Sequence, residues 1–171
     1  MAPRYALRAG SCFVFILGGS VGYAQGVPSE GLVAVTFAAT EIAPARRMPI
    51  GGGKEFAVVV RAMVASNDAG NPVLNNMGGR CQFNLLFDTV ARTVEQHGFC
   101  TYEDSDGHQI FEQCDFVPGA PNQCKLNGGT GKFEGLQDSV VITASPVKTG
   151  VDGIVQIVGH KKGTYKIIST K

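Results

Sequence analysis

Residues 54–66 read KEFAVVVRAMVAS, and this stretch decides the fold class. From Phe56 to Val64 it is apolar and largely β-branched, with Arg61 as its single charge, and this composition favours a β-strand. A strand that is apolar on both faces has an interior on one side and a second layer, a loop or a partner subunit on the other. The stretch therefore predicts a strand whose Arg61 points inward, and it makes a homo-oligomer a reasonable expectation.

Similar apolar runs recur along the chain, and no segment of a dozen residues keeps a helical period. Segments rich in Gly, Pro, Asn and Asp separate the runs, as in an antiparallel meander. Because closure removes exposed sheet edges, the pattern predicts an all-β fold, either a small antiparallel eight-stranded β-barrel or a sandwich. The expected strands are residues 31–40, 54–66, 81–88, 91–103, 108–116, 131–143 and 153–169, the last broken near Lys161-Lys162-Gly163; the expected loops are 44–53, 67–79, 104–107 and 118–129.

The N-terminus predicts export. Arg4 and Arg8 precede a short apolar run, and small residues, Gly22 and Ala24, occupy the positions that a signal peptidase recognises. The run is too short for a permanent membrane anchor. We expect residues 1–24 to be a cleaved signal peptide, residues 25–171 to form one β-barrel domain, and the protein to be secreted or periplasmic.

The charge balance argues against polyanionic partners. The chain has 15 basic and 14 acidic residues, and signal cleavage would remove two of the basic ones. A nearly neutral domain has no electrostatic footprint for nucleic acid or for an anionic membrane surface. We expect no nucleic-acid partner and no membrane association after cleavage.

Four cysteines remain after cleavage: Cys81, Cys100, Cys114 and Cys124. An even number in an exported chain predicts two disulfides, and three pairings are possible. Pairing Cys81 with Cys100 and Cys114 with Cys124 is preferred, because each bond would join neighbouring strands or a strand to its own loop. A zinc site is disfavoured, since the chain has no C-x2-C pair.

The glycine-rich segment 128–135, GGTGKFEG, resembles a strand of bacterial secreted proteins related to the allene oxide cyclase and dirigent barrel families. The stretch 101–111 resembles the hairpin before that strand, and 163–167 resembles the closing strand. The likeness covers residues 80–170 and implies an allene oxide cyclase-like barrel. Its motifs contain none of the family's catalytic residues, so it supports the fold more than an activity.

Gly131 and Gly135 have a spacing of four, which would place them on one face of one strand, where they would allow sharp bending. A nucleotide-binding loop is excluded, because Leu126 and Phe133 occupy the positions where that motif needs Gly and Ser or Thr. No cofactor is expected.

The strongest candidates for chemistry are Glu112 and Arg61. Alternation puts Glu112 on the same face as Ile110 and Cys114, where a carboxylate could polarise a substrate and pair with an inward Arg61. The turn 104–107 resembles the start of a calcium loop through Asp104 and Asp106, but the expected glutamate and flanking helices are missing, so a hairpin turn is the preferred interpretation.

No hydrolase motif is present, and the mature histidines, at 97, 108 and 160, are expected to be exposed or structural. The leading hypothesis is a barrel that binds a small apolar or aromatic ligand in its interior. One alternative is a cofactor-free isomerase or cyclase of the allene oxide cyclase type, as the resemblance implies; it would need a polar residue at the cavity floor. The other is a structural or partner-binding barrel with a filled interior.

Overall fold

The computed structural model describes residues 26–168, which form a sheet of nine strands and one 3-10 turn. Within this range no helix is long and apolar enough to cross a membrane. The predicted signal peptide lies outside the described residues. The elements in chain order are β1 (Glu30–Glu41), β2 (Met48–Gly51), β3 (Lys54–Asn67), β4 (Met77–Asp88), β5 (Thr93–Glu103), β6 (Gln109–Phe116), β7 (Gln123–Gly129), η1 (Gly131–Phe133), β8 (Leu136–Val147) and β9 (Gln156–Ile167).

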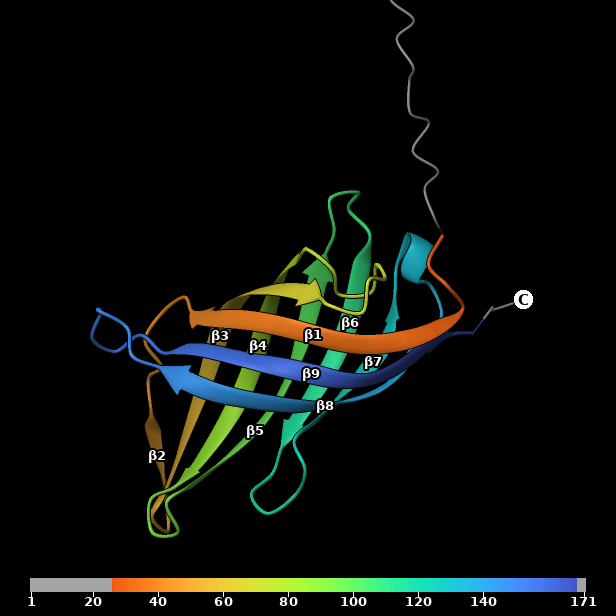
Figure 1. The fold of residues 1–171 in the computed structure, drawn as a ribbon. Coiled ribbons are helices and arrows are strands. Elements are labelled where there is room, and N and C mark those ends of the chain that lie inside the picture. The colour runs from red at the N-terminus through yellow and green to blue at the C-terminus, as the bar shows by residue number, and fades with distance from the viewer. Residues whose placement is uncertain (1–25, 169–171) are drawn as a thin grey trace, which may run out of the picture.

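The sheet closes into a barrel because β1 pairs antiparallel with both β9 and β3 (Figure 1). Around the barrel the strands follow the order β1-β9-β8-β7-β6-β5-β4-β3, and β2 is an extra strand that pairs with β3. Apart from the closing pair, every strand in the barrel lies beside its neighbour in the chain. The predicted all-β, antiparallel, eight-stranded barrel is therefore confirmed.

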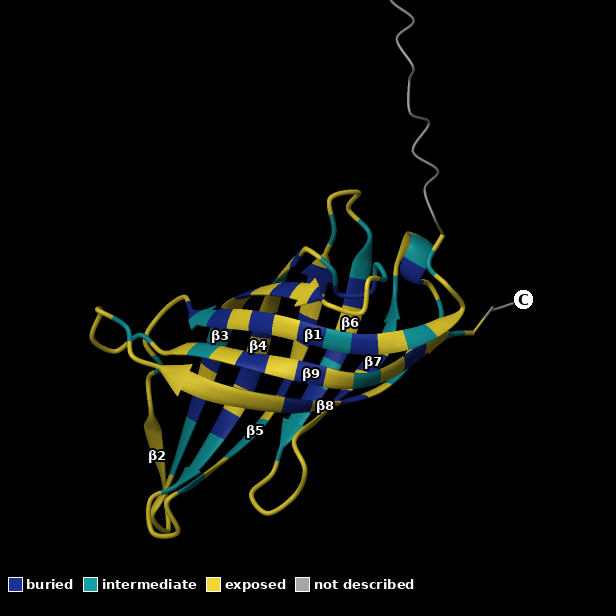
Figure 2. Cartoon of the chain, in the orientation of Figure 1, coloured by how far each residue is buried: buried dark blue, intermediate teal, exposed yellow. Residues whose placement is uncertain are grey.

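Alternation along the strands separates the core from the outer surface, as the bands of colour in Figure 2 show. In β3, Val59 and Met63 point inward and are buried, whereas Val58 and Val64 point outward and are exposed. Arg61 shares the inward face and is buried as well, as the sequence predicted. The same period-two pattern recurs in the other barrel strands and produces a single core.

Two disulfides join neighbouring strands. Cys81 of β4 is bonded to Cys100 of β5, and Cys114 of β6 is bonded to Cys124 of β7. Each bonded pair is also a directly opposed pair in the strand register. The structure therefore has the preferred pairing, and each bond closes a loop of a size that stabilises a fold by about 3 kcal/mol in the chain-entropy model.

Two predictions for the barrel strands were wrong, and they compensate in the count of eight; outside the barrel, the predicted loop 44–53 contains the short strand β2. The segment 118–129, predicted as a loop, contains β7, in which Cys124 and Leu126 point inward. Only its first residues, with Pro118 and Pro121, form a loop. Conversely, β9 continues through Lys161, where a break was expected, because this lysine points into the barrel and is paired there.

The expected role of Gly131 and Gly135 was also wrong. Gly131 belongs to η1 and Gly135 to the turn before β8, which begins five residues later than predicted at Leu136. Both glycines have positive φ, of 57° and 77°, in the left-handed region. A Cβ at Gly135 would collide with the carbonyl oxygen of Ile168. These glycines therefore shape a tight connection rather than bend a strand.

Candidate functional site

The barrel interior has a filled half and a hollow half. The filled half lies at the end where β1 begins and β9 ends, and the β3–β4 loop and η1 close it (Figure 1). Its core side chains are almost completely buried: Tyr102, Tyr165, Phe133, Leu74, Met77, Ile110, Leu136, Val33 and Val73. Val73 and Leu74 come from the β3–β4 loop, where Asn67 Nδ2 donates a hydrogen bond of 2.7 Å to the Val73 carbonyl oxygen.

The hollow half contains a cavity of about 740 Å³. Four phenylalanines and several aliphatic side chains of the barrel strands line it, and the loops 117–122 and 153–155 and the β1–β2 connection, through Ala45 and Arg47, contribute to the wall. The aromatic residues are Phe37, Phe83, Phe87 and Phe116, and the buried polar residues that reach the cavity are Glu41, Arg61 and Lys161. This half of the barrel therefore does not have the filled interior that one of the alternatives expected.

Lys161 forms the floor of the cavity together with two residues beneath it. Its Nζ lies 2.5 Å from Glu112 Oε2 and 2.8 Å from Tyr102 Oη, and the Tyr102 hydroxyl donates to Glu112 Oε2 at 3.0 Å. Lys161 lines the cavity, whereas Glu112 and Tyr102 do not. We call these three residues the floor triad, and they mark the boundary between the two halves.

The electrostatics of the floor triad favour one ion pair and a neutral phenol. Burial raises the pKa of Tyr102 well above its usual value, and the nearby charge of Glu112 and their hydrogen bond raise it further. The side chains of Lys161 and Glu112 are 1% and 0% exposed, so their charges are compensated locally rather than by solvent. Glu112 Oε1 is buried without a hydrogen-bond partner among the described residues.

Glu112 points inward as predicted, but the expected pair between Arg61 and Glu112 was wrong. Arg61 Nη2 lies 3.3 Å from Glu41 Oε1, and Arg61 Nη1 donates to Gln96 Oε1 at 3.3 Å. The reason is barrel closure, which places Glu41 of β1 directly opposite Arg61 in the register. Burial lowers the pKa of Arg61, and the charge and hydrogen bond of Glu41 oppose that effect.

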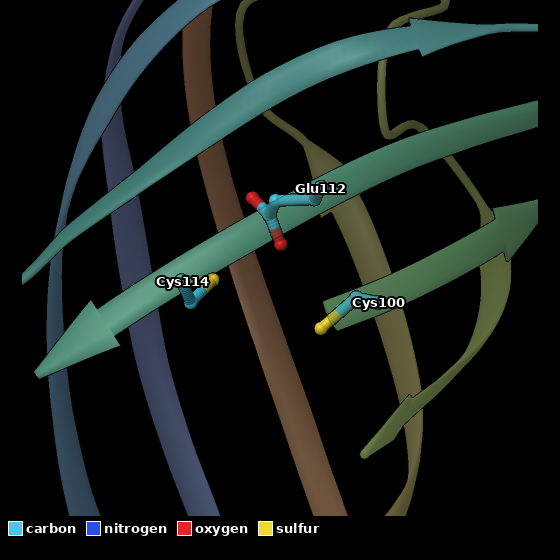
Figure 3. Close-up of side chains that lie close together, drawn as sticks. All are labelled: Cys100, Glu112 and Cys114. Atoms are coloured by element: carbon cyan, nitrogen blue, oxygen red, sulfur yellow. The ribbon is translucent and has the colours of Figure 1, made fainter. Parts of the chain in front are cut away.

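Cys100, Glu112 and Cys114 lie close together on neighbouring strands (Figure 3). The sulfur atoms of the two cysteines and one carboxylate oxygen of Glu112 lie within 4.8 Å of one another. Both sulfurs are already bonded in disulfides, so neither is available as a thiolate ligand. The cluster is therefore part of the cavity wall and floor rather than a metal site.

The calcium candidates lie in a hairpin turn. Asp104 Oδ1 accepts hydrogen bonds from the backbone N–H groups of Asp106 and His108. Lys132 Nζ lies 2.8 Å from Asp104 and 2.9 Å from Asp106. Burial acts to raise the pKa of Asp104, but the hydrogen bonds from Lys132 and the backbone lower it overall. A calcium ion would have to displace the ammonium group, and calcium binding stays an untested prediction.

His97 belongs to a surface cluster outside the cavity. Its Nε2 lies 2.6 Å from Glu95 and its Nδ1 lies 2.7 Å from Asp115. These hydrogen bonds, with the one to Glu95 the larger effect, raise the pKa of His97. The side chain is 48% exposed, in line with the expected surface position.

The outer face of β3 exposes Val58, Ala62 and Val64, as its doubly apolar sequence predicted. In the register, Ala38 of β1 lies beside Val64 and Val158 of β9 lies beside Ala38. These residues form an apolar strip on the outer surface. A homo-oligomer stays a prediction.

Sequence reasoning missed Lys161, Tyr102 and Glu41. A usable signal was present for Lys161, because Ile157, Gly159, Lys161, Gly163 and Tyr165 alternate with outward residues along β9. The dibasic pair followed by glycine instead resembled a surface turn. Glu41 and Tyr102 could be placed only once the register of β1 against β3, and of β5 against β6, was known.

Comparisons with known proteins support the architecture. No family model and no curated protein sequence matches the chain. Its structure is similar to that of the pterocarpan synthase dirigent protein GePTS1, with a TM-score of 0.51 and 10% sequence identity over 91% of this chain and 100% of that chain. At this identity the likeness shows the fold alone. It supports the resemblance of the sequence to dirigent-type barrels at the level of architecture.

Proposed function

We propose that this chain is an exported barrel that binds one small, largely apolar or aromatic molecule in its hollow half. The observation that carries the proposal is the cavity of about 740 Å³ in a barrel whose other half is fully packed. Its size lies within the range of about 300–1,000 Å³ that is typical of small-molecule sites. A mostly apolar wall with a few buried polar groups is also the usual composition of such sites.

Two features support export. Both disulfides are of the kind that forms in an oxidising compartment. The predicted signal peptide, residues 1–24, supplies the route to that compartment. Accumulation of the protein in the periplasm or medium, with its N-terminus at Gln25, is the expected result, and intact Met1 in the mature protein would contradict it.

Binding can be tested by filling the cavity. Ala39 of β1 is buried and lines the cavity, whereas its neighbour Ala38 points outward. Ala39→Leu should weaken binding of the uncharged fluorescent probe N-phenyl-1-naphthylamine at least about tenfold, because the new side chain occupies ligand space. Ala38→Leu is the matched control and should leave the affinity unchanged. No probe binding to the wild type, or equal loss in both variants, would contradict an interior site.

The cofactor-free isomerase or cyclase remains a second candidate, because the cavity floor carries the fixed polar residue that such an enzyme needs. Lys161 could donate a hydrogen bond to a substrate oxygen and hold one conformer for reaction, while the apolar wall excludes water. Glu112 lies beneath Lys161 and would act as a positioning residue. With a confirmed substrate, Glu112→Gln should lower kcat more than it changes KM, and unchanged turnover would eliminate that role.

A further inference from the structure

The charged side chains that line the cavity are already neutralised. Lys161 is paired with Glu112, and Arg61 is paired with Glu41. The side chain of Arg61 is 8% exposed and that of Glu41 is 6% exposed. The remaining charged residue on the wall, Arg47, is half-exposed and pairs with Glu55 at 3.4 Å. The cavity therefore contains strong hydrogen-bond donors without a net positive charge.

Each buried cation also keeps a donor that is not used. An ammonium group has three N–H donors, and Lys161 uses two of them for Tyr102 and Glu112. Arg61 has five N–H donors, and its side-chain hydrogen bonds to Gln96 and Glu41 use two of them. Unpaired buried donors are unfavourable, so a ligand oxygen that accepts from them would bind favourably.

A charged ligand oxygen would fit less well than an uncharged one. A carboxylate would enter a largely apolar cavity in which both buried cations already have a carboxylate partner, Glu112 or Glu41. It would lose its hydration without gaining a free positive charge in return.

We propose, on the basis of the binding function above, that the hollow half selects uncharged aromatic molecules that carry acceptor oxygens, such as ketones, phenols or ethers. Glu112 and Glu41 are then specificity residues. By neutralising Lys161 and Arg61, they leave the two cations as hydrogen-bond donors and prevent the cavity from binding organic anions. The hydrogen-bond donors of Lys161 and Arg61, together with the apolar wall, thus define the ligand class.

A matched ligand series tests the proposal on the wild-type protein. We would measure displacement of N-phenyl-1-naphthylamine by 2-acetylnaphthalene, 2-ethylnaphthalene and 2-naphthoate at pH 7. The ketone should bind at least about tenfold more tightly than the ethyl compound, which has the same carbon skeleton but lacks the carbonyl oxygen. The carboxylate should bind at least about tenfold more weakly than the ketone. The ethyl compound matching the ketone, or the carboxylate binding most tightly, would overturn the inference.

Removing the charge of one carboxylate should change the preference between an anionic and an uncharged ligand. Glu112→Gln keeps the size of the side chain but leaves Lys161 without its counter-charge, so 2-naphthoate should gain at least about tenfold relative to 2-acetylnaphthalene. Glu95→Gln, on the outer face of β5, is the control and should not alter the ratio. Glu41→Gln provides a second test at Arg61 if the first variant does not fold. An unchanged ratio in folded variants would refute the role of these carboxylates.

The two proposals fail in different ways. If the probe does not bind, the interior site itself is wrong. A second outcome is that the probe binds, Ala39→Leu weakens its binding, and the three naphthalene compounds bind with equal affinity. In that case the interior binding site is supported, and the proposed ligand class is wrong.

Discussion

The filled and hollow halves of the barrel are built from the same eight strands, but only one half is packed. Both contain large aromatic residues on inward positions, so strand sequence alone does not explain the difference. The filled half is completed by Val73 and Leu74 from the β3–β4 loop and by Phe133 from η1. At the other end, the loops 117–122 and 153–155 form part of the cavity wall instead. The connections, more than the strands, decide where space remains.

The floor triad at the boundary is better explained by function than by stability. A buried ion pair must overcome the desolvation of two charges, and apolar residues of similar volume often stabilise a core equally well or better. Lys161 and Glu112 are nevertheless placed where the apolar core ends and the cavity begins. This position is what a polar contact for a ligand requires.

The largest expected effect tests whether the two halves differ in packing. Phe133→Ala should lower the free energy of unfolding by about 3–5 kcal/mol, because the ring is completely buried in the filled half. The ring of Phe116 is half-buried, borders the cavity and packs on Phe83 with the ring centroids 5.8 Å apart. Phe116→Ala should therefore lower the free energy of unfolding by only about 1–2 kcal/mol. Urea denaturation of both variants provides the measurement, and equal losses would remove the distinction between the halves.

A smaller effect tests the loop that closes the filled half. Asn67 bonds the Val73 carbonyl and accepts from the backbone N–H groups of Ala34 and Ala69. Asn67→Ala should destabilise the protein by about 1–3 kcal/mol, since buried backbone groups lose their partners. It should also speed hydrogen exchange at residues 68–76.

Thr149→Ala is the matched change at the hollow end, where the hydroxyl bonds groups of the exposed loop before β9. Its cost should stay within about 0.5 kcal/mol, as is usual at exposed positions. If Thr149→Ala destabilises the protein as much as Asn67→Ala does, the two ends do not differ in how tightly their connections are held.

Local sequence pattern was sufficient for much of the fold. The recurring apolar runs and the turn residues between them predicted eight antiparallel strands, and the resemblance to known barrels implied that they close. Both Arg61 and Glu112 were expected on the inner face, where the structure has them. The short spacing of the cysteines along the chain favoured the disulfide pairing that the structure has, although Cys124 was expected in a loop. These features depend on period and on neighbours in the chain, which a sequence displays directly.

Contacts across the barrel could not be predicted in the same way. Glu112 on β6 bonds Lys161 on β9, and Arg61 on β3 bonds Glu41 on β1, and both choices depend on how the strands close. Lys161 resembled part of a surface turn because a buried lysine is rare unless it is paired. The cavity depends on whether loops fold inward, and no residue pattern in 117–122 or 153–155 revealed that.

The smallest expected effect lies on the outer surface, where solvent weakens the interactions between charged side chains. The same kinds of charge interact more strongly inside the barrel. Hydrogen bonds to Glu95 and Asp115 raise the pKa of His97, so the midpoint of its Cε1 proton in an NMR titration should lie above about 6.5, the value in an unfolded chain. The folded state then holds the proton more tightly, so this contribution to stability is complete below about pH 6.5 and is lost as pH rises through the folded pKa.

Glu95→Gln should lower the His97 midpoint more than Asp115→Asn does, because the bond to Glu95 has the larger effect. His97→Gln should leave binding of N-phenyl-1-naphthylamine unchanged, since the imidazole is outside the cavity. A His97 midpoint at or below about 6.5 would show that the exposed carboxylates do not hold the imidazolium in solution. Glu112→Gln is expected to change the ligand preference strongly, whereas Glu95→Gln is expected to change the His97 midpoint only weakly. This difference would show that burial, rather than the number of charges, gives the interior ion pairs their effect.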